Sequence, residues 1–297
     1  MKQKIRFIIN PISGVGAKGS IPDMIEKYLD HTKFDYDITI TEYRKHAKKI
    51  ALESALDGFD IVCAVGGDGS VHEVGTALIG TKTKLAIIPA GSGNGLARHM
   101  KIPLDIRKAI ECINDNSSLR MDTGLVNDKP FLGTGGYAFD ALIAKRFDEY
   151  HSRGFWSYIK LVFKEYARYK PAKMSIELDG VKEDLSVILC TVANASEFGN
   201  GFCVSPDSNV ADGELELCIL KPFSILSAPS VVWRFFQRTA NKSRFSEVRK
   251  FKKMRIVLED TMAHYDGEPF LVRKELNIQI VPKSLSILVG ANYNFAC

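Results

Sequence analysis

The stretch IVCAVGGDGSVHEV, residues 61–74, carries the strongest fold signal in the chain. The apolar run at residues 61–65 is typical of a buried strand, and a glycine-rich loop follows it. Glycine allows the backbone to approach a ligand closely, and a helix beginning near Ser70 would direct its N–H groups to the same place. The sequence therefore predicts a phosphate site, where Asp68 fits if Mg²⁺ lies beside it. A tight turn capped by Asp68 is the alternative.

A second glycine-rich loop follows the next predicted strand. It reads PAGSGNGLAR over residues 89–98 and offers Ser92 and Asn94 as short hydrogen-bonding side chains. Arg98 adds a cation one turn into a predicted helix, and a surface ion pair with Asp68 is its alternative role. Two such loops after successive strands open toward one crevice, which is stronger evidence of a phosphate site than either loop alone.

The first 125 residues alternate predicted strands and helices. Four segments have the apolar runs or alternation of strands: residues 4–10, 36–40, 61–65 and 85–88. Helical spacing predicts one helix from Ile21, one around Ile50 and one from Ile106. Repeated strand–helix units predict an α/β fold with a parallel sheet covered on both faces, and ligands bind such sheets beyond the carboxyl ends of the strands.

The rest of the chain favours antiparallel strands. Asp179-Gly180 is a hairpin turn signal between the β-rich residues 174–178 and 185–193. Alternation predicts further strands at residues 215–219 and 276–280, and Pro282 is expected to end the latter. Two helices are expected among these strands, at residues 156–169 and 225–238. We therefore expect two domains, residues 1–125 and 126–297, with the return of the last few residues to the first domain left open.

A third glycine-rich segment gives a rival interpretation. Residues 14–19 match G-x-G-x-x-G after the first strand, and Glu42 lies about where a dinucleotide fold places its ribose acid. The spacing disagrees, because four residues precede the first glycine and Pro22 places the helix start after the third. We interpret the segment as a phosphate flap, with a plain surface loop as the alternative.

Composition places few limits on the partner. The net charge of +5 is too small to indicate nucleic-acid binding, but it suits a phosphate-bearing partner or an anionic membrane surface. No run approaches the roughly 18 apolar residues of a membrane span, and residues 1–10 lack the apolar run of a secretory signal. No cysteine pair has C-x-x-C spacing, so we expect buried, reduced thiols in a cytosolic protein. The cysteines are Cys63, Cys112, Cys190, Cys203, Cys218 and Cys297.

Several motifs in one order resemble the diacylglycerol kinase catalytic family, which includes sphingosine, ceramide and bacterial lipid kinases. The first group is Asn10-Pro11 with Ser13-Gly14, Gly66-Gly67-Asp68-Gly69-Ser70 with Glu73, and Pro89 with Gly91-Ser92 and Asn94. The second group is Pro206-Asp207, Ala211-Asp212-Gly213 with Leu215, and Asp266-Gly267-Glu268. The resemblance covers nearly the full length. Serine replaces the family's usual threonine at positions 70 and 92, which keeps the hydroxyl, and Gly95 replaces a polar residue.

The resemblance implies a Rossmann-like three-layer domain with a parallel sheet, then a mostly antiparallel β-sandwich, with ATP between them. It implies that ATP is lined by Asn10, Ser13, Gly67, Asp68, Gly69, Ser70, Glu73, Gly91, Ser92 and Asn94. Asp68 would manage Mg²⁺ and phosphate, and Glu268, helped by Asp266, would draw the proton from the acceptor hydroxyl. The alternative is a hairpin turn with Glu268 exposed. Asp212 resembles a structural Mg²⁺ ligand of some members, and Asp122 resembles another family acid. A plain turn is the alternative for both.

Three functions compete at this point. The leading hypothesis is a soluble lipid kinase, cytoplasmic and peripheral at the inner membrane surface, that phosphorylates diacylglycerol, a sphingoid base or an undecaprenol-like alcohol. The second is an NAD kinase-like enzyme for a soluble hydroxyl, which shares the Gly-Gly-Asp-Gly loop. The third is a nucleotide sensor without catalysis, which the presence of Asp68 and Glu268 disfavours. A homodimer is left open.

One basic segment, residues 231–255, is a candidate for contact with anionic membrane. Its only acid is Glu247, and Trp233, Phe235, Phe236 and Phe245 lie among its charges. The alternative is that the aromatic residues belong to the core and the charges form an ordinary solvated face. The basic residues are Arg234, Arg238, Lys242, Arg244, Arg249, Lys250, Lys252, Lys253 and Arg255.

Overall fold

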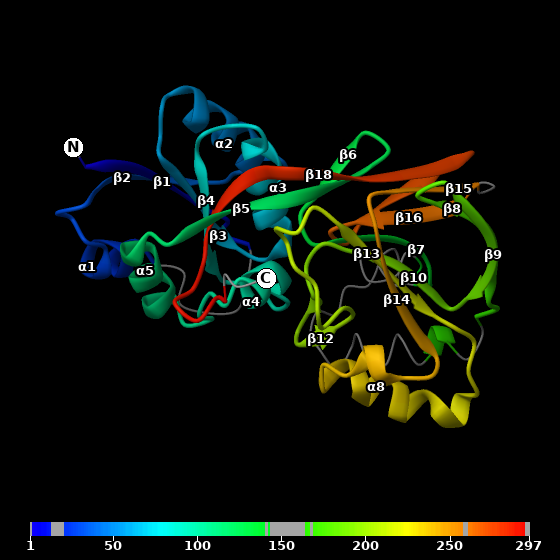
Figure 1. Ribbon diagram of the computed structural model, residues 1–297. Helices are drawn as coiled ribbons and strands as arrows, with labels where there is room; N and C mark the ends of the chain where they lie inside the picture. The colour runs from blue at the N-terminus through cyan, green and yellow to red at the C-terminus, as the bar shows by residue number, and fades with distance from the viewer. Residues whose placement is uncertain are drawn as a thin grey trace. The chain divides into compact units, whose positions relative to one another are not determined.

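The computed structural model describes residues 2–12, 21–139, 142, 164–166, 169–257 and 261–294. They form two compact units (Figure 1). The first unit comprises Met1–Asp122 with Lys283–Cys297, and the second comprises Thr123–Pro282. Ser13, the segment 14–19, Cys297 and most of the helix expected at 156–169 lie outside the described residues.

The first unit is an α/β domain built around a parallel sheet. In chain order its elements are β1 (Gln3–Ile9), α1 (Ile21–Tyr28), β2 (Phe34–Ile40), α2 (His46–Leu56), β3 (Ile61–Gly66), α3 (Asp68–Leu78), β4 (Lys84–Pro89), α4 (Gly95–His99), α5 (Ile106–Asp115), most of β5 (Ser118–Val126) and the end of β18 (Glu275–Leu288). The strand order is β2-β1-β3-β4, all parallel, and Ile287 of β18 pairs in parallel with Leu85 of β4. Helices α1 and α5 lie on one side of this sheet, and α2 and α3 lie on the other (Figure 1).

The strands and helices predicted for this half are confirmed. β3 and β4 carry the apolar runs, and every residue of β3 is buried, because a central parallel strand is covered on both faces. β2 lies at the sheet edge, where Ile40 is 55% exposed. On α1 the buried residues Ile21 and Ile25 are four positions apart, which is the helical repeat expected from the sequence.

The second unit is a β-sandwich. In chain order its elements are β6 (Lys129–Phe131), β7 (Thr134–Ala138), β8 (Ala172–Leu178), β9 (Val181–Val187), β10 (Leu189–Ala193), β11 (Glu197–Gly199), β12 (Phe202–Cys203), β13 (Leu215–Leu220), the 3₁₀ turn η2 (Ile225–Ser227), α8 (Ala228–Phe236), the 3₁₀ turn η3 (Ala240–Lys242), β14 (Ser246–Phe251), β15 (Lys253–Val257), β16 (Thr261–Tyr265), β17 (Glu268–Val272) and the first part of β18. One antiparallel sheet has the order β18-β15-β8-β9, and a six-stranded antiparallel sheet has the order β14-β13-β10-β7-β16-β17.

The core of the sandwich lies between its two sheets, and the six-stranded sheet is covered on its other face as well. Ile176 of β8 and Leu217 of β13 belong to the core between the sheets. On the other face, Leu220 of β13 packs with Val231 and Phe235 of α8. The strand expected at residues 215–219 is therefore confirmed, and β13 buries every residue because both of its faces are covered.

The predicted hairpin at Asp179-Gly180 is confirmed, but the run that follows it is divided. Both turn residues have positive φ, 48° and 89°, which is the backbone of a type I′ turn. The apolar run 185–193 is not one strand: β9 pairs with β8, whereas β10 pairs with β13 and β7 in the other sheet. The change occurs at Ile188, whose N–H donates to the carbonyl oxygen of Leu220 at 2.7 Å. A strand that turns the corner between packed sheets keeps an uninterrupted apolar sequence, because both parts are buried.

The expectation that Pro282 ends its strand is wrong, because β18 continues to Leu288. The registered pairs with β15 reach Gln279, and β4 pairs further along at Ile287. Proline has no N–H donor, and a strand tolerates it at an irregularity where the ladder changes partner. The next residue, Lys283, has a φ of 48° and donates its N–H to the buried carboxylate of Asp122 at 2.6 Å. Asp122 therefore supports this irregularity rather than capping a turn.

The cysteines agree with the sequence expectation for the residues that the structure describes. Cys63, Cys112, Cys190, Cys203 and Cys218 are buried and free of disulfides. Burial raises the thiol pKa of Cys112 and of Cys203 to about 11, so these thiols stay protonated near neutral pH. Among the described residues, no helix has the length and apolar character needed to cross a bilayer.

Candidate functional site

The site in the first unit is built at the carboxyl ends of three neighbouring strands. β1, β3 and β4 are adjacent and parallel, so the loops that follow them meet at one edge of the sheet. The side-chain amide of Asn10, after β1, donates to the hydroxyl oxygen of Ser70 at 3.1 Å, while its carbonyl oxygen accepts the N–H of Ile12 at 3.0 Å. Asn10 therefore ties the first loop to the start of α3, and its contact with a nucleotide stays a prediction.

The two glycine-rich loops touch through their backbones. A methyl group at Gly91 would lie 2.3 Å from the Cα of Gly67, and one at Gly67 would lie 3.1 Å from the Cα of Gly91. Such distances leave no room for a side chain at position 91. Glycine at these two positions therefore lets one loop pack on the other, which is a requirement that the sequence pattern alone did not reveal.

Asn94 holds the second loop in shape. Its backbone is left-handed, with a φ of 55°, and its side chain is 7% exposed. The side-chain oxygen accepts the N–H of Gly91 at 3.1 Å, and the side-chain amide donates to the carbonyl oxygen of Gly91 at 2.8 Å. These bonds show that Asn94 positions Gly91, and its contact with a nucleotide stays a prediction.

Asp68 joins the first glycine-rich loop to the second. One carboxylate oxygen accepts the N–H of Asn94 at 2.8 Å, and the other accepts the N–H of Gly95 at 2.7 Å. A carboxylate is a strong acceptor for backbone amides at the start of a helix, and here that helix is α4. Asp68 is thus part of the loop framework, in addition to any role toward a ligand.

The remaining residues expected to line a nucleotide differ in their surroundings. Gly69 and the buried Ser70 lie in the first turn of α3, where backbone N–H groups lack partners within the helix. Ser92 is exposed in the second loop. Glu73, one turn further along α3, accepts the backbone N–H of Lys45 at 3.0 Å and so fixes the start of α2. Arg98 donates to the carbonyl oxygen of Gly93 at 3.2 Å.

Replacing Gly91 with alanine should destabilise this loop pair. The added methyl group would meet the backbone of Gly67, and relieving such an overlap typically costs about 1–3 kcal/mol. We expect a lower melting temperature, measured by calorimetry. Gly69→Ala in the first loop is the matched control, because nothing lies within 4 Å of the added methyl group. A Gly91→Ala protein as stable as Gly69→Ala would contradict the argument.

The site residues of the second unit lie on a tight hairpin. Asp266 and Gly267 connect β16 to β17 with φ values of 46° and 82°, again the backbone of a type I′ turn, and Tyr265 pairs with Glu268 across it. The hairpin alternative is therefore correct for the backbone, and Glu268 is partly exposed at the start of β17. A hairpin does not exclude catalysis, because it holds Glu268 at a fixed place.

Asp266 is engaged by the backbone of the loop before β7. Its carboxylate accepts the N–H groups of Leu132, Gly133 and Thr134 at 2.8, 2.8 and 3.1 Å. Asn194 holds the same loop by donating to the carbonyl oxygens of Leu132 and Gly133, at 2.7 and 2.8 Å. Asp266 therefore positions this turn, and a direct role for it in proton transfer stays a prediction.

No sequence motif pointed to Asn194, although it is 1% exposed in the structure. Its partners are about sixty residues earlier in the chain, and no local pattern marks them. The signal available in the sequence was an amide residue directly after the apolar run that forms β10. A buried asparagine at a strand end must find partners, and here they belong to the loop that Asp266 clamps.

Asp212 lies in a turn and pairs with a cation. Its carboxylate accepts the N–H of Glu214 at 3.1 Å and forms an ion pair with Lys250 at 2.6 Å. Nearby, the buried Glu216 accepts hydrogen bonds from Ser205 and Ser208, and burial raises its pKa. In the described part of the chain, no three His, Cys, Asp or Glu side chains are placed to hold a metal ion. A structural ion at Asp212 stays a prediction.

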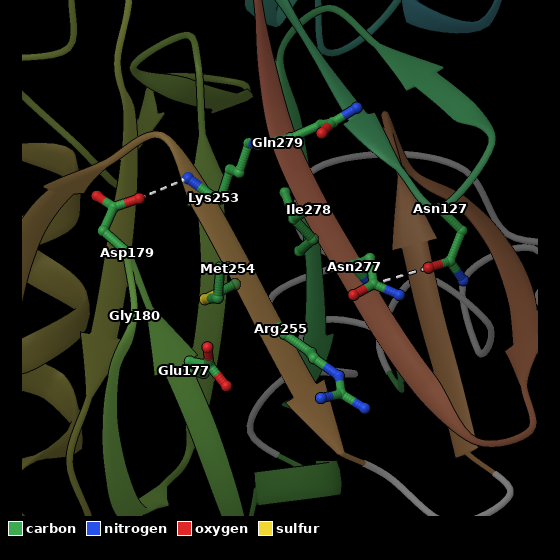
Figure 2. A pocket seen from close by; sticks show the side chains of 10 residues that line it. All are labelled: Asn127, Glu177, Asp179, Gly180, Lys253, Met254, Arg255, Asn277, Ile278 and Gln279. Carbon is green, nitrogen blue, oxygen red and sulfur yellow. Dashed lines mark hydrogen bonds between the residues drawn. The ribbon is translucent and has the colours of Figure 1, made fainter.

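A groove on the second unit contains none of the predicted site residues. It has a volume of about 560 Å³, and Figure 2 shows its polar lining. Asp179 accepts the N–H of Lys253 at 2.8 Å, and Asn127 accepts the N–H of Asn277 at 2.8 Å, so these bonds fix neighbouring turns and strands. The lining residues are Asn127, Glu177, Asp179, Gly180, Lys253, Met254, Arg255, Asn277, Ile278 and Gln279.

Comparison with known proteins identifies both halves of the chain. Residues 4–126 match the family model of the diacylglycerol kinase catalytic domain, and residues 134–289 match that of the YegS C-terminal NAD kinase beta sandwich-like domain. A diacylglycerol kinase of Mycobacterium tuberculosis is 25% identical over 293 residues, covering 96% of this chain and 94% of that protein. One of Bacillus subtilis is 29% identical over 233 residues, covering 74% of each.

Solved structures share the fold. The crystal structure of a diacylglycerol kinase from Bacillus anthracis has a TM-score of 0.74 at 20% identity and covers 97% of both chains. A longer protein of Synechocystis is 27% identical over 251 residues, and this chain spans 58% of its length.

These findings show the class of the protein, which is a phosphotransferase with an alcohol group as acceptor. Within that class, the chain belongs to the diacylglycerol kinase catalytic family, and its second domain is of the YegS type. The resemblance drawn from the motifs is confirmed, as is the expected fold of a parallel-sheet α/β domain followed by a β-sandwich. The matches do not favour the NAD kinase-like alternative.

Proposed function

We propose that the protein transfers the γ-phosphate of ATP to a hydroxyl group of a lipid, with diacylglycerol as the first candidate. The observation that carries the proposal is the pair of glycine-rich loops, locked together at the carboxyl ends of adjacent parallel strands by the Gly67–Gly91 contact and by Asp68. Backbone amides at the start of α3 suit phosphate oxygens. Relatives named diacylglycerol kinase favour that lipid as the acceptor.

Magnesium fits the donor set of the first unit. Mg²⁺ at phosphate sites is usually held by one or two carboxylates together with phosphate oxygens and waters, so no protein cage is needed. The Asp68 carboxylate, which accepts the amides of Asn94 and Gly95, supplies oxygen atoms of the kind that Mg²⁺ prefers as ligands. When bound, the ion would neutralise charge on the phosphates.

In this proposal, different residues of the chain bind the phosphates, support the loops and accept the proton. The loops after β3 and β4 bind the phosphates, and Asn10, Asn94 and Asp68 keep these loops in shape. Glu268 accepts the proton of the attacking hydroxyl, because a hydroxyl attacks phosphorus more readily as its proton leaves. Asp266 orients the turn that carries Glu268. The reaction takes place from the cytoplasm at the inner membrane surface, where the acceptor lipid lies.

Labelled ATP tests the proposal. The protein is incubated with γ-labelled ATP and Mg²⁺ in parallel arms that contain diacylglycerol vesicles, a sphingoid base, a mixed lipid extract or NAD. We expect label to enter the organic phase, most strongly with diacylglycerol. Label that enters only the aqueous NAD product would overturn the proposal in favour of a soluble acceptor, and ATP binding without transfer in every arm would indicate a sensor.

A further inference from the structure

One helix of the second unit carries apolar residues on its outer side. Leu226 of η2 and Trp233 of α8 are 88% and 64% exposed, and Ile225 is 52% exposed. Leu226, the exposed Pro229 and Trp233 are spaced three and four positions apart, so they lie on one face. The opposite face of α8 already packs on the six-stranded sheet through Val231 and Phe235. The outer apolar face is therefore additional to the core.

The surroundings of this face are positively charged. Residues 217–246 contain no aspartate or glutamate. Arg234, Lys242 and Arg244 form no ion pair with a carboxylate in the described part of the chain, and Lys242 and Arg244 are exposed. We call Ile225, Leu226, Trp233 and these three basic residues the α8 surface.

Four other basic residues of the segment 231–255 have carboxylate partners. Arg249 pairs with Glu183 and Glu247, Lys250 with Asp212, and Arg255 with Glu275. Arg238 pairs with Glu197. These charges are balanced within the protein. Phe235 belongs to the core, and the α8 surface is the part of this segment with both uncovered apolar groups and unbalanced charge.

We propose that the α8 surface docks on a bilayer containing anionic phospholipid. Tryptophan and leucine beside arginine and lysine match the chemistry of a membrane interface, where apolar groups enter the acyl boundary and cations meet phosphate headgroups. A bilayer explains both features together, whereas an apolar protein partner would explain only the first. The inference rests on the proposed function insofar as docking brings the enzyme to its lipid acceptor.

Hydrogen bonds connect the segment after α8 to the loop beside the turn that carries Glu268. Arg238, two residues after α8, donates to Glu197 and Ser196. Two residues before Ser196, the side-chain amide of Asn194 donates to the carbonyl oxygen of Leu132. The N–H of Leu132 in turn donates to the carboxylate of Asp266. All these residues belong to the second unit. Docking of α8 therefore fixes the position of the Asp266-Gly267-Glu268 turn relative to the bilayer.

Vesicle co-sedimentation tests the proposal without measuring activity. The full chain is mixed with phosphatidylcholine vesicles, with or without phosphatidylglycerol, at low and high salt. We expect binding that requires phosphatidylglycerol and weakens in salt. The double variant L226S/W233S and the triple variant R234Q/K242Q/R244Q should each lose at least about tenfold in vesicle affinity. Their melting temperatures should stay unchanged, because the altered groups are outside the core.

Matched controls come from other surfaces. Leu56 of α2 is 86% exposed, and the exposed Lys252 and Lys253 lie just before and at the start of β15, so L56S and K252Q/K253Q should bind vesicles as the parent does. Equal losses in the controls, or α8 variants that bind normally, would overturn the proposal. So would a stable dimer that L226S/W233S converts to monomer, because a second copy would then cover the surface. Turnover on a dispersed short-chain diacylglycerol should not change in the α8 variants, so failed docking and failed catalysis are distinguishable.

Discussion

Replacing Asp68 with asparagine is expected to lower phosphoryl transfer by at least about 100-fold, since loss of metal-assisted charge neutralisation commonly costs several kcal/mol. The structure adds a second reason. The carboxylate accepts the N–H groups of Asn94 and Gly95, and an asparagine would set its own N–H₂ group against one of those donors. We therefore expect a loss of loop order together with the loss of turnover.

The control for this variant is Asp60→Asn. Asp60 also accepts a backbone N–H, that of Lys4 at 2.8 Å, but it precedes β3 at the amino end of the strand. Turnover of Asp60→Asn should match that of the parent protein. Dependence of the residual rate on Mg²⁺ separates the two roles of Asp68: a raised Mg²⁺ requirement indicates lost metal contact, and a lowered melting temperature indicates lost loop support. If purified Asp68→Asn had the turnover of the parent protein, neither the metal contact nor the loop support would be needed for transfer.

The sequence could predict those parts of the fold that depend on neighbouring residues. The apolar run of β3 and the glycines after it are contiguous, so the strand, the loop and the start of α3 follow from local rules. The hairpin at Asp179-Gly180 is another example, because both residues adopt the positive φ that their types tolerate.

The bonds that shape the candidate site could not be predicted in this way. Asp68 and Asn94 are 26 residues apart, and Asp266 and Leu132 are 134 apart, so no window of sequence contains both partners. An aspartate among glycines is compatible with a metal ligand, a turn cap or a clamp on a distant loop. The packing of β3 beside β4, and of β16 beside β7, shows the third role, which is compatible with a metal-binding role for Asp68 as well.

The segment around α8 shows a different limit. Its apolar residues lie on two faces, so helical periodicity could not say which face the sheet covers. The structure assigns Val231 and Phe235 to the core and leaves Leu226 and Trp233 outside. The count of basic residues in the segment 231–255 has a related limit. It could not reveal that Arg249 and Arg255 are paired, because their carboxylate partners come from strands distant in the sequence.

Replacing Glu268 with glutamine should separate binding from chemistry. A general base typically contributes about 10²–10⁴-fold, so we expect turnover to fall by that amount while ATP affinity stays near that of the parent. The melting temperature should also hold, since the amide has the size of the carboxylate and Glu268 lies partly exposed beside the turn. The matched control is Glu275→Gln, which removes an exposed carboxylate paired with Arg255 and should leave turnover unchanged.

The variant Asp266→Asn distinguishes the structural role of Asp266 from the proton-accepting role of Glu268. Its carboxylate accepts three backbone N–H groups, so the substitution should lower the melting temperature by removing acceptors for Leu132, Gly133 and Thr134, whereas Glu268→Gln should not. Steady-state rates with γ-labelled ATP and dispersed diacylglycerol, alongside thermal unfolding and ATP titration, measure all three properties. A Glu268→Gln protein that lost ATP binding and kept its rate would place Glu268 in the nucleotide pocket. A stable Asp266→Asn protein with the larger loss of rate would make Asp266 the base.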